Sequence, residues 1–258
     1  MKSSIYLFLI FFLSGYFPEL VMAQERVLLV ADEWPPMHVL AHFLESTAHF
    51  EVDTANQEDL RTDLSEFDHM FMYVHKVLQK EVESRLIDYT EKGGNLIVLH
   101  HGIASAKLNN PGWLDFVGVD LYPRDSKENA WDVLHDTAHT MVNLAPDHFI
   151  TSQNISYQKS SYFSSGDWDN QAGNFPCFTL DSTEIFVNQI FNPEKQHVVL
   201  FGVAEIQQPT SGWYRKAGKG WLFYYQAGHQ ISDFENPHFK QVLLNTLELI
   251  HDQSNNRD

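Results

Sequence analysis

Two adjacent histidines, His100 and His101, directly follow a short apolar run and could carry chemistry. The run, residues 96–99, is typical of a buried strand that begins at Asn95, and Gly93-Gly94 before it is typical of the end of a helix. In open α/β sheets, ligands bind at the carboxyl ends of the strands. A pair of imidazoles at such an end therefore indicates a functional site.

A third histidine and a carboxylate are predicted to reach the same place. His229 follows the apolar run 221–225, and Glu184 begins a further predicted strand. Imidazoles and a carboxylate can hold a zinc-type ion or act as general acids and bases. We therefore expect four catalytic residues: His100, His101, Glu184 and His229. Three of them, His100, His229 and Glu184, are also candidate ligands of a divalent metal.

No local sequence signature supports this grouping, because the chain lacks a His-Glu-x-x-His motif and the convergence depends on topology alone. The alternative is that each histidine hydrogen-bonds a loop carbonyl. His139, in Asp136-Thr137-Ala138-His139, is a further candidate that either lines the same cleft or belongs to a turn.

The order of elements predicts a doubly wound α/β sheet of three layers. Apolar runs predict strands, and periodic segments predict helices between them. The final helix starts at Asn236-Pro237 and extends to about His251. Strands are expected at 26–31, 50–53, 68–74, 95–99, 184–191, 197–203 and 221–225, and helices from 35, over 79–92 and from 237.

The middle of the chain, residues 102–181, is rich in Ser, Asn, Asp and Gly and is expected to be a long binding loop or lid. Its aromatic residues include Tyr162 and Trp168, which could stack on the face of a sugar or pack locally.

The first residues resemble an export signal. Lys2 precedes an apolar run at 5–13, and Val21-Met22-Ala23 ends in a small residue, as a signal peptidase requires. The run is too short for a membrane span. We expect a signal peptide at 1–23, cleavage near Ala23 and a periplasmic or secreted protein, with an uncleaved anchor as the alternative. A single domain at 24–252 and a disordered tail at 253–258 would follow.

Composition limits the partners. The formal net charge of −17 opposes binding to nucleic acid, whereas small neutral molecules such as sugars are compatible. No glycine-rich phosphate loop supports a nucleotide cofactor. Cys177 is the single cysteine and stands in no nucleophile elbow, so a buried inert thiol is expected.

Several blocks, in the same order, resemble the ThuA-like (trehalose-utilisation) family. The most specific is the block from Gly218-Lys219-Gly220 to Gly228-His229. The other blocks are 89–100, Trp113 to Gly118, 136–141, Thr183-Glu184-Ile185-Phe186, and 236–239. Differences from the family pattern include Asn95 in place of a third glycine, Thr140 in place of proline, Thr183 in place of an acidic residue and Trp221 in place of arginine.

The resemblance implies a flavodoxin-related fold like that of class I glutamine amidotransferases. Where those enzymes carry a nucleophilic cysteine, this chain has His100-His101-Gly102, which excludes cysteine-dependent glutaminase chemistry. The family is associated with trehalose and with 3-keto-glycosides. We therefore expect Trp113, His139, Tyr162 and Trp168 to contact a carbohydrate substrate.

The leading hypothesis is an exported, metal-assisted hydrolase or lyase that acts on glycosides or 3-keto-glycosides. Two alternatives stay open. One is a sugar-binding protein without turnover, and the other is a scaffold subunit of a sugar-utilisation system. The oligomeric state does not follow from the sequence.

Overall fold

A computed structural model describes residues 24–47, 49–163 and 172–255 of the chain. The predicted signal peptide at 1–23 and Trp168 lie outside these residues. A central sheet of ten strands has the order β2-β1-β3-β4-β12-β11-β10-β6-β8-β7, and β5 (Val119–Asp120) pairs with β9 (Ile190–Phe191) in a small second sheet.

Five neighbouring strands of the sheet are parallel and form its first half. They are β2 (Phe50–Ala55), β1 (Glu25–Ala31), β3 (His69–Tyr73), β4 (Asn95–Leu99) and β12 (Gly220–Tyr225). Consecutive side chains of a strand point to opposite faces, and in β4 Leu96 and Val98 join one core cluster while Ile97 and Leu99 join the other. The continuous apolar runs exist because both faces are covered.

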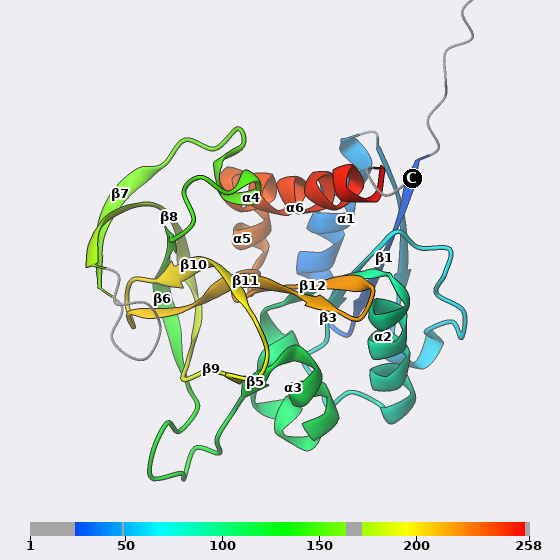
Figure 1. The fold of residues 1–258 in the computed structure, drawn as a ribbon, viewed down its shortest axis with the longest axis horizontal. Coiled ribbons are helices and arrows are strands. Elements are labelled where there is room, and N and C mark those ends of the chain that lie inside the picture. Colours follow the sequence, from blue (N-terminus) through cyan, green and yellow to red (C-terminus); the bar gives the residue numbers. More distant parts are fainter. Residues whose placement is uncertain (1–23, 48, 164–171, 256–258) are drawn as a thin grey trace, which may run out of the picture.

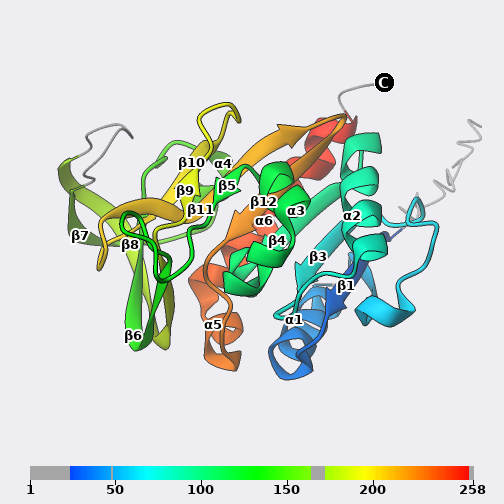
Figure 2. The same ribbon diagram turned by 90° about the horizontal axis from the view of Figure 1, so that it is seen from below.

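Helices cover both faces of this half, which confirms the predicted doubly wound, three-layer α/β class (Figures 1 and 2). One face packs against α1 (Trp34–Ser46), α5 (Ile231–Glu235) and α6 (Pro237–Asn255), and the other against α2 (Lys80–Lys92) and α3 (Pro111–Val117). Helix α6 begins at Pro237 as predicted and ends four residues later than expected.

The second half of the sheet is antiparallel and was not predicted as such. Its strands are β11 (Gln208–Ala217), β10 (Val198–Val203), β6 (Asp132–Asn143), β8 (Ala172–Val187) and β7 (Gln158–Phe163), with the short helix α4 (Phe149–Ser152) after β6. The expectation of a loop over 102–181 was therefore wrong for much of its length. Glu184 also does not begin a strand but lies near the end of β8.

Short 3-10 turns at Gln57–Asp59, His100–Ile103 and Ser105–Asn109 complete the described elements. Within the described ranges of the chain, no helix combines the length and apolar character needed to cross a membrane.

Candidate functional site

The carboxyl ends of the parallel strands meet at one edge of the sheet and bring the predicted histidines together. His100 and His101 follow β4, and His229 follows the neighbouring strand β12 after three residues. His100 has a φ of +36°, an uncommon backbone conformation for a residue other than glycine. Gly102 is required behind this turn, because a Cβ there would lie 2.2 Å from Val98 Cγ1.

Glu184 reaches the histidines from the antiparallel half. Strands β6 and β8 pair with register shifts between Leu134 and His139, and Asp136 and Ser182 have positive φ values there. Such irregularities bend a strand and redirect its side chains. His135 Nδ1 lies 2.6 Å from Glu184 Oε1, which leaves Oε2 facing the histidines.

Three imidazole nitrogens converge on Glu184 Oε2. His100 Nε2 lies 3.4 Å, His229 Nδ1 3.6 Å and His101 Nε2 3.8 Å from this oxygen. The four ligand atoms lie within 4.8 Å of one another. The side chains come from three elements separated by up to 129 residues, since the chain passes from His100 to His229 (229 − 100 = 129).

The tautomer of His100 follows from its partners. His100 Nδ1 lies 2.5 Å from the carbonyl oxygen of Gln226, which can only accept, so Nδ1–H is the donor. In the neutral ring, Nε2 then presents a lone pair toward the Glu184 carboxylate. Two acceptors face each other there, and a cation or a proton between them would satisfy both.

Electrostatics favours an ionised Glu184 carboxylate beside neutral His101 and His229 rings. Burial raises the pKa of Glu184, but contacts with His100 and His101 outweigh it and hold that pKa well below its usual range. Burial, reinforced by the other histidines, lowers the pKa of His101 to about 3. Burial and His100 also lower the pKa of His229. Carboxylate and neutral imidazole are the forms that bind metal ions.

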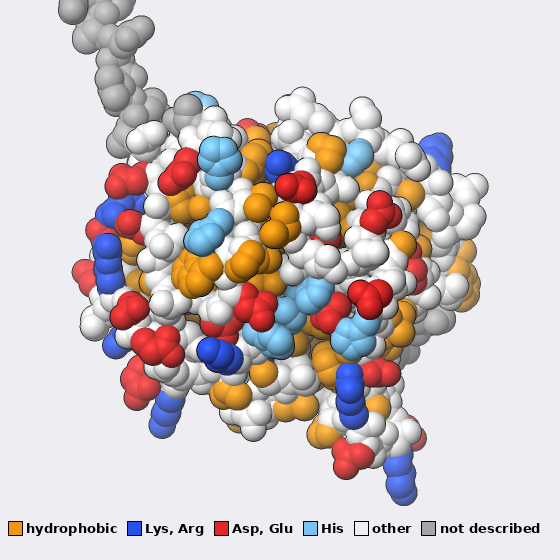
Figure 3. All heavy atoms as spheres, turned by 180° about the vertical axis from the view of Figure 1, so that it is seen from behind, with side chains coloured by type: hydrophobic (Ala, Val, Ile, Leu, Met, Phe, Trp, Pro, Cys, Tyr) orange, Lys and Arg blue, Asp and Glu red, His pale blue; other side chains and the backbone are white. Residues whose placement is uncertain are grey.

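His101, Glu184 and His229 line a cavity of about 510 Å³, whereas His100 is fully buried. The charged and histidine side chains of its lining that the sequence reasoning missed are Glu33, His75, His135 and Arg124. Trp131 and Phe186 form an apolar part of the wall, with ring centroids 5.6 Å apart. Figure 3 shows histidine side chains gathered beside acidic side chains on one face of the molecule. A cavity with an apolar wall and several polar groups can bind a hydroxylated small molecule.

His229 and Glu184 are held by a common buried carboxylate. Asp233, fully buried at the start of α5, accepts hydrogen bonds at Oδ2 from the His229 N–H at 2.8 Å and from the Thr183 hydroxyl at 2.8 Å. The N–H groups of Gly228 and Gln230 also donate to this oxygen. One side chain thus fixes the loop of His229 and the strand segment of Glu184.

The other predicted contact residues lie away from this cavity. Trp113 is fully buried beneath the turn after β4 and donates its Nε1–H to the Gly102 carbonyl at 2.8 Å. His139 is fully buried, with Nε2 2.8 Å from Ser211 Oγ. Tyr162 is buried on β7 against Phe175. None of these three lines the cavity around Glu184.

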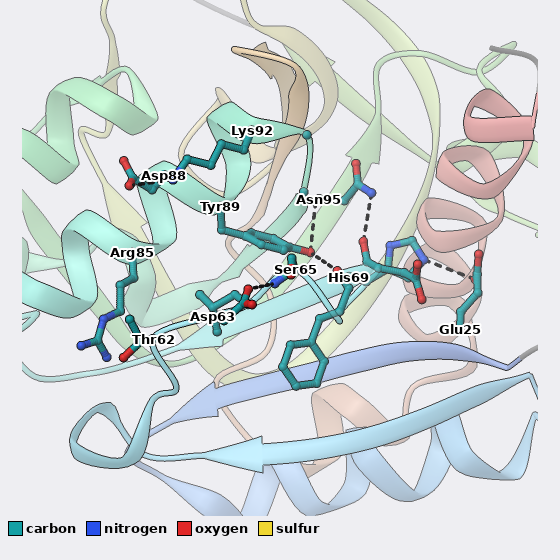
Figure 4. Close-up of a pocket in the computed structure, with 15 residues that line it drawn as sticks. Glu25, Thr62, Asp63, Ser65, His69, Arg85, Asp88, Tyr89, Lys92 and Asn95 are labelled. Atoms are coloured by element: carbon teal, nitrogen blue, oxygen red, sulfur yellow. Dashed lines mark hydrogen bonds and ion pairs between the residues drawn. The ribbon is translucent and has the colours of Figure 1, made fainter. Parts of the chain in front are cut away.

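A second hollow of about 590 Å³ lies at the opposite edge of the sheet, near the amino ends of β3 and β4 (Figure 4). Its polar groups are largely engaged in local structure. Tyr89 donates its hydroxyl to the Phe67 carbonyl and accepts from the Asn95 N–H, and Lys92 pairs with Asp88. We therefore place the candidate site at the histidine edge, where three imidazole nitrogens converge on one carboxylate oxygen.

The fold and the site together define a three-layer α/β protein with a His/Glu cluster at the carboxyl ends of its parallel strands. The family described as trehalose utilisation, ThuA, matches residues 20–249. The chain therefore belongs to the ThuA family, and this membership supports a role in carbohydrate utilisation. No curated protein matches the chain.

Solved structures share the fold. A ThuA-like protein from Parabacteroides merdae has a TM-score of 0.64 at 13% identity, over 88% of this chain and 90% of its own. A second ThuA-like protein, from Bacteroides uniformis, has a TM-score of 0.58 at 14% identity, over 91% and 95%. A β-galactosidase from Bacillus circulans sp. alkalophilus has a TM-score of 0.53 at 13% identity, over 88% of this chain and 31% of its own.

Proposed function

We propose that this protein is an exported carbohydrate-processing enzyme that acts on glycosides or 3-keto-glycosides with a divalent, zinc-type ion held by His100, His229 and Glu184. The observation that carries the proposal is the convergence of imidazole nitrogens on Glu184 Oε2 while His100 Nδ1 is committed to the Gln226 carbonyl. A metal-binding histidine commonly donates its other ring N–H to such an acceptor.

The spacing of the ligand atoms fits an ion. Zinc binds nitrogen and oxygen at about 2.0–2.2 Å, so two ligand atoms of a tetrahedral site lie about 3.3–3.6 Å apart. The separations of Glu184 Oε2 from His100 Nε2 and His229 Nδ1, 3.4 and 3.6 Å, agree with this value. His135, on the other carboxylate oxygen, would orient Glu184 as a supporting residue.

Three protein ligands leave a position open for substrate, as in catalytic zinc sites. An ion bound there supplies a Lewis acid that polarises a carbonyl oxygen. In a 3-keto-glycoside, loss of the proton at C2 breaks the C2–H bond, forms a C1–C2 double bond and releases the oxygen at C1, which takes up a proton. His101, beside the three proposed ligands and neutral, would take the proton from C2 and pass it to the released oxygen.

The substrate class rests on family membership and on the cavity. The ThuA family links the chain to carbohydrate utilisation, and the apolar wall at Trp131 and Phe186 suits the face of a sugar ring. Export rests on the sequence of residues 1–23 alone, with a positive residue, an apolar run and a small residue at Ala23.

The experiment is to purify the protein without chelator or affinity tag, measure its metal content and assay turnover of 3-keto-trehalose. We expect near-stoichiometric divalent metal and turnover, both lost in His229→Ala. Turnover that survives in both His101→Ala and His229→Ala would overturn the site. A metal-free protein that binds trehalose without turnover would instead establish the sugar-binding alternative.

A further inference from the structure

Two cavity residues lie outside the Glu184 cluster. Glu33 follows β1, and His75 follows β3. His75 Nδ1 lies 3.1 Å from Glu33 Oε1, and the two side chains are 54% and 45% exposed. Exposed polar side chains in a loop are ordinarily free to move, so what holds this pair in place is informative.

A buried lysine holds the backbone of the His75 loop. The Lys107 side chain is fully buried, and its Nζ donates to the carbonyl oxygens of Val74 and Lys76, each at 2.8 Å, and of His75 at 3.4 Å. Burying an ammonium group is costly, and lysine is almost never fully buried without partners. All three partners of Lys107 are consecutive residues of this one loop.

The amide side of the same loop is held by a carboxylate. Asp32 accepts from the N–H of His75 at 2.7 Å through Oδ1 and from the N–H of Lys76 at 2.9 Å through Oδ2. The loop is therefore fixed through its carbonyl groups by the Lys107 amine, whose pKa burial lowers to about 7, and through its amide groups by the Asp32 carboxylate. Functional side chains that must be held in one geometry need this kind of support.

The geometry of His75 argues against a second ion. Glu33, His75 and His101 have ligand atoms within 4.8 Å of one another, but the His75 and His101 rings are stacked, with centroids 4.1 Å apart and planes 7° from parallel. An imidazole lone pair lies in the plane of its ring, so one ion cannot lie in two parallel, stacked planes. The stacking therefore excludes an ion bound by His75 and His101 together.

We propose that Glu33 and His75 form a subsite that binds two neighbouring hydroxyl groups of a sugar, next to the part of the substrate that faces the Glu184 cluster. The carboxylate accepts hydrogen bonds, and the adjacent imidazole, whose Nδ1 contacts Glu33 Oε1, offers its Nε2 as a second polar group. The stack on His101 places this subsite directly beside the proposed reaction centre. The inference rests on the proposed function, because it names the part of the same cavity that recognises the carbohydrate.

The test compares two variants with matched controls elsewhere on the surface. Glu33→Ala removes the carboxylate, and His75→Phe keeps a ring to stack on His101 but removes both nitrogens. The controls are Glu81→Ala on α2 and His42→Phe on α1, which are exposed positions outside the cavity. Binding of trehalose and of 3-keto-trehalose is measured by calorimetry, and metal content is measured on the same samples.

We expect the affinity of both sugars to fall at least about tenfold in Glu33→Ala and His75→Phe, with the metal content and the controls unchanged. Wild-type affinity in both variants would overturn the subsite and leave the proposed function intact. Loss of metal in these variants would overturn it in favour of a second ion site. A wild-type protein that binds neither sugar would refute the proposed function, and the subsite with it.

Discussion

His135 Nδ1 lies 2.6 Å from Oε1 of Glu184, so this carboxylate is oriented by one oxygen while the other faces three imidazoles. In the proposed metal site His135 is a supporting residue, and loss of such residues lowers metal affinity 10- to 100-fold. We expect His135→Ala to weaken zinc binding by about that factor and Glu184→Gln to abolish it. Competition with a chromogenic chelator measures both. Equal zinc affinity in wild type and Glu184→Gln would contradict this role, and His42→Ala serves as the control.

Asp233 should matter for stability as well as for the site. Its Oδ2 is the acceptor for buried N–H groups of the His229 loop and for Thr183. Asp233→Ala leaves these donors unpaired, and we expect a loss of about 2–4 kcal/mol in the free energy of unfolding. Asp233→Asn keeps an acceptor oxygen and should lose about half of that or less. Urea unfolding followed by circular dichroism gives both values. Equal losses of unfolding free energy in the two variants would show that Asp233 stabilises the fold through its charge and not through its hydrogen bonds.

Because His139 is buried, we expect the free energy of unfolding to depend on pH. Burial, with a smaller effect of His100, lowers the pKa of this histidine to about 3 in the folded protein, whereas an unfolded histidine has a pKa of about 6.5. Between these two pKa values the unfolded state binds one proton more than the folded state. The stability that the folded protein has with neutral His139 is therefore fully present above about pH 6.5 and is lost as the pH decreases toward 3. The contribution of one such group is about 1.4 kcal/mol per pH unit.

We therefore expect His139→Gln to reduce the slope of unfolding free energy against pH by about this amount between roughly pH 4 and 5.5. Urea unfolding at several pH values measures the slope, and His42→Gln at an exposed position should retain the wild-type slope. An unchanged slope in His139→Gln would mean that the ring is protonated in the folded protein.

Cys177 should be dispensable for chemistry. The thiol is buried on β8, and burial together with Glu205 raises its pKa, so it is protonated at neutral pH. Cys177→Ala should keep turnover of 3-keto-trehalose within about twofold, with a stability loss of about 1 kcal/mol from the small cavity created. More than tenfold lower turnover in a folded variant would contradict this.

The parallel half of the fold was predictable because each strand is covered on both faces. Residues 27–31 and 96–99 are buried throughout, so their sequences are continuous apolar runs. The antiparallel half gave no such signal. Strand β6 exposes much of its first half, including Leu134 and His135, and β8 exposes its first three residues, so neither strand forms a continuous apolar run.

The candidate site was partly predictable for the same reason. His100, His101 and His229 follow apolar runs, and the carboxyl-end rule grouped them before any geometry was known. The same rule applied to the strand 69–73 would have pointed to His75. His135 could not have been found in this way, because only the register shifts between β6 and β8 direct it to Glu184. Trp113, predicted to contact substrate, is fully buried and donates its indole N–H to the Gly102 carbonyl.

The wide separation of the cluster along the chain has a consequence for folding. His100 and Glu184 lie 84 residues apart, and they meet only after the parallel strands have paired and the β6–β8 pairing has formed beside them. Such non-local pairings form late and slowly, because the entropy of closing long loops must be met first. Ligand binding at this cluster would therefore report on completion of folding, and it would stabilise the finished chain without assisting any fragment of it.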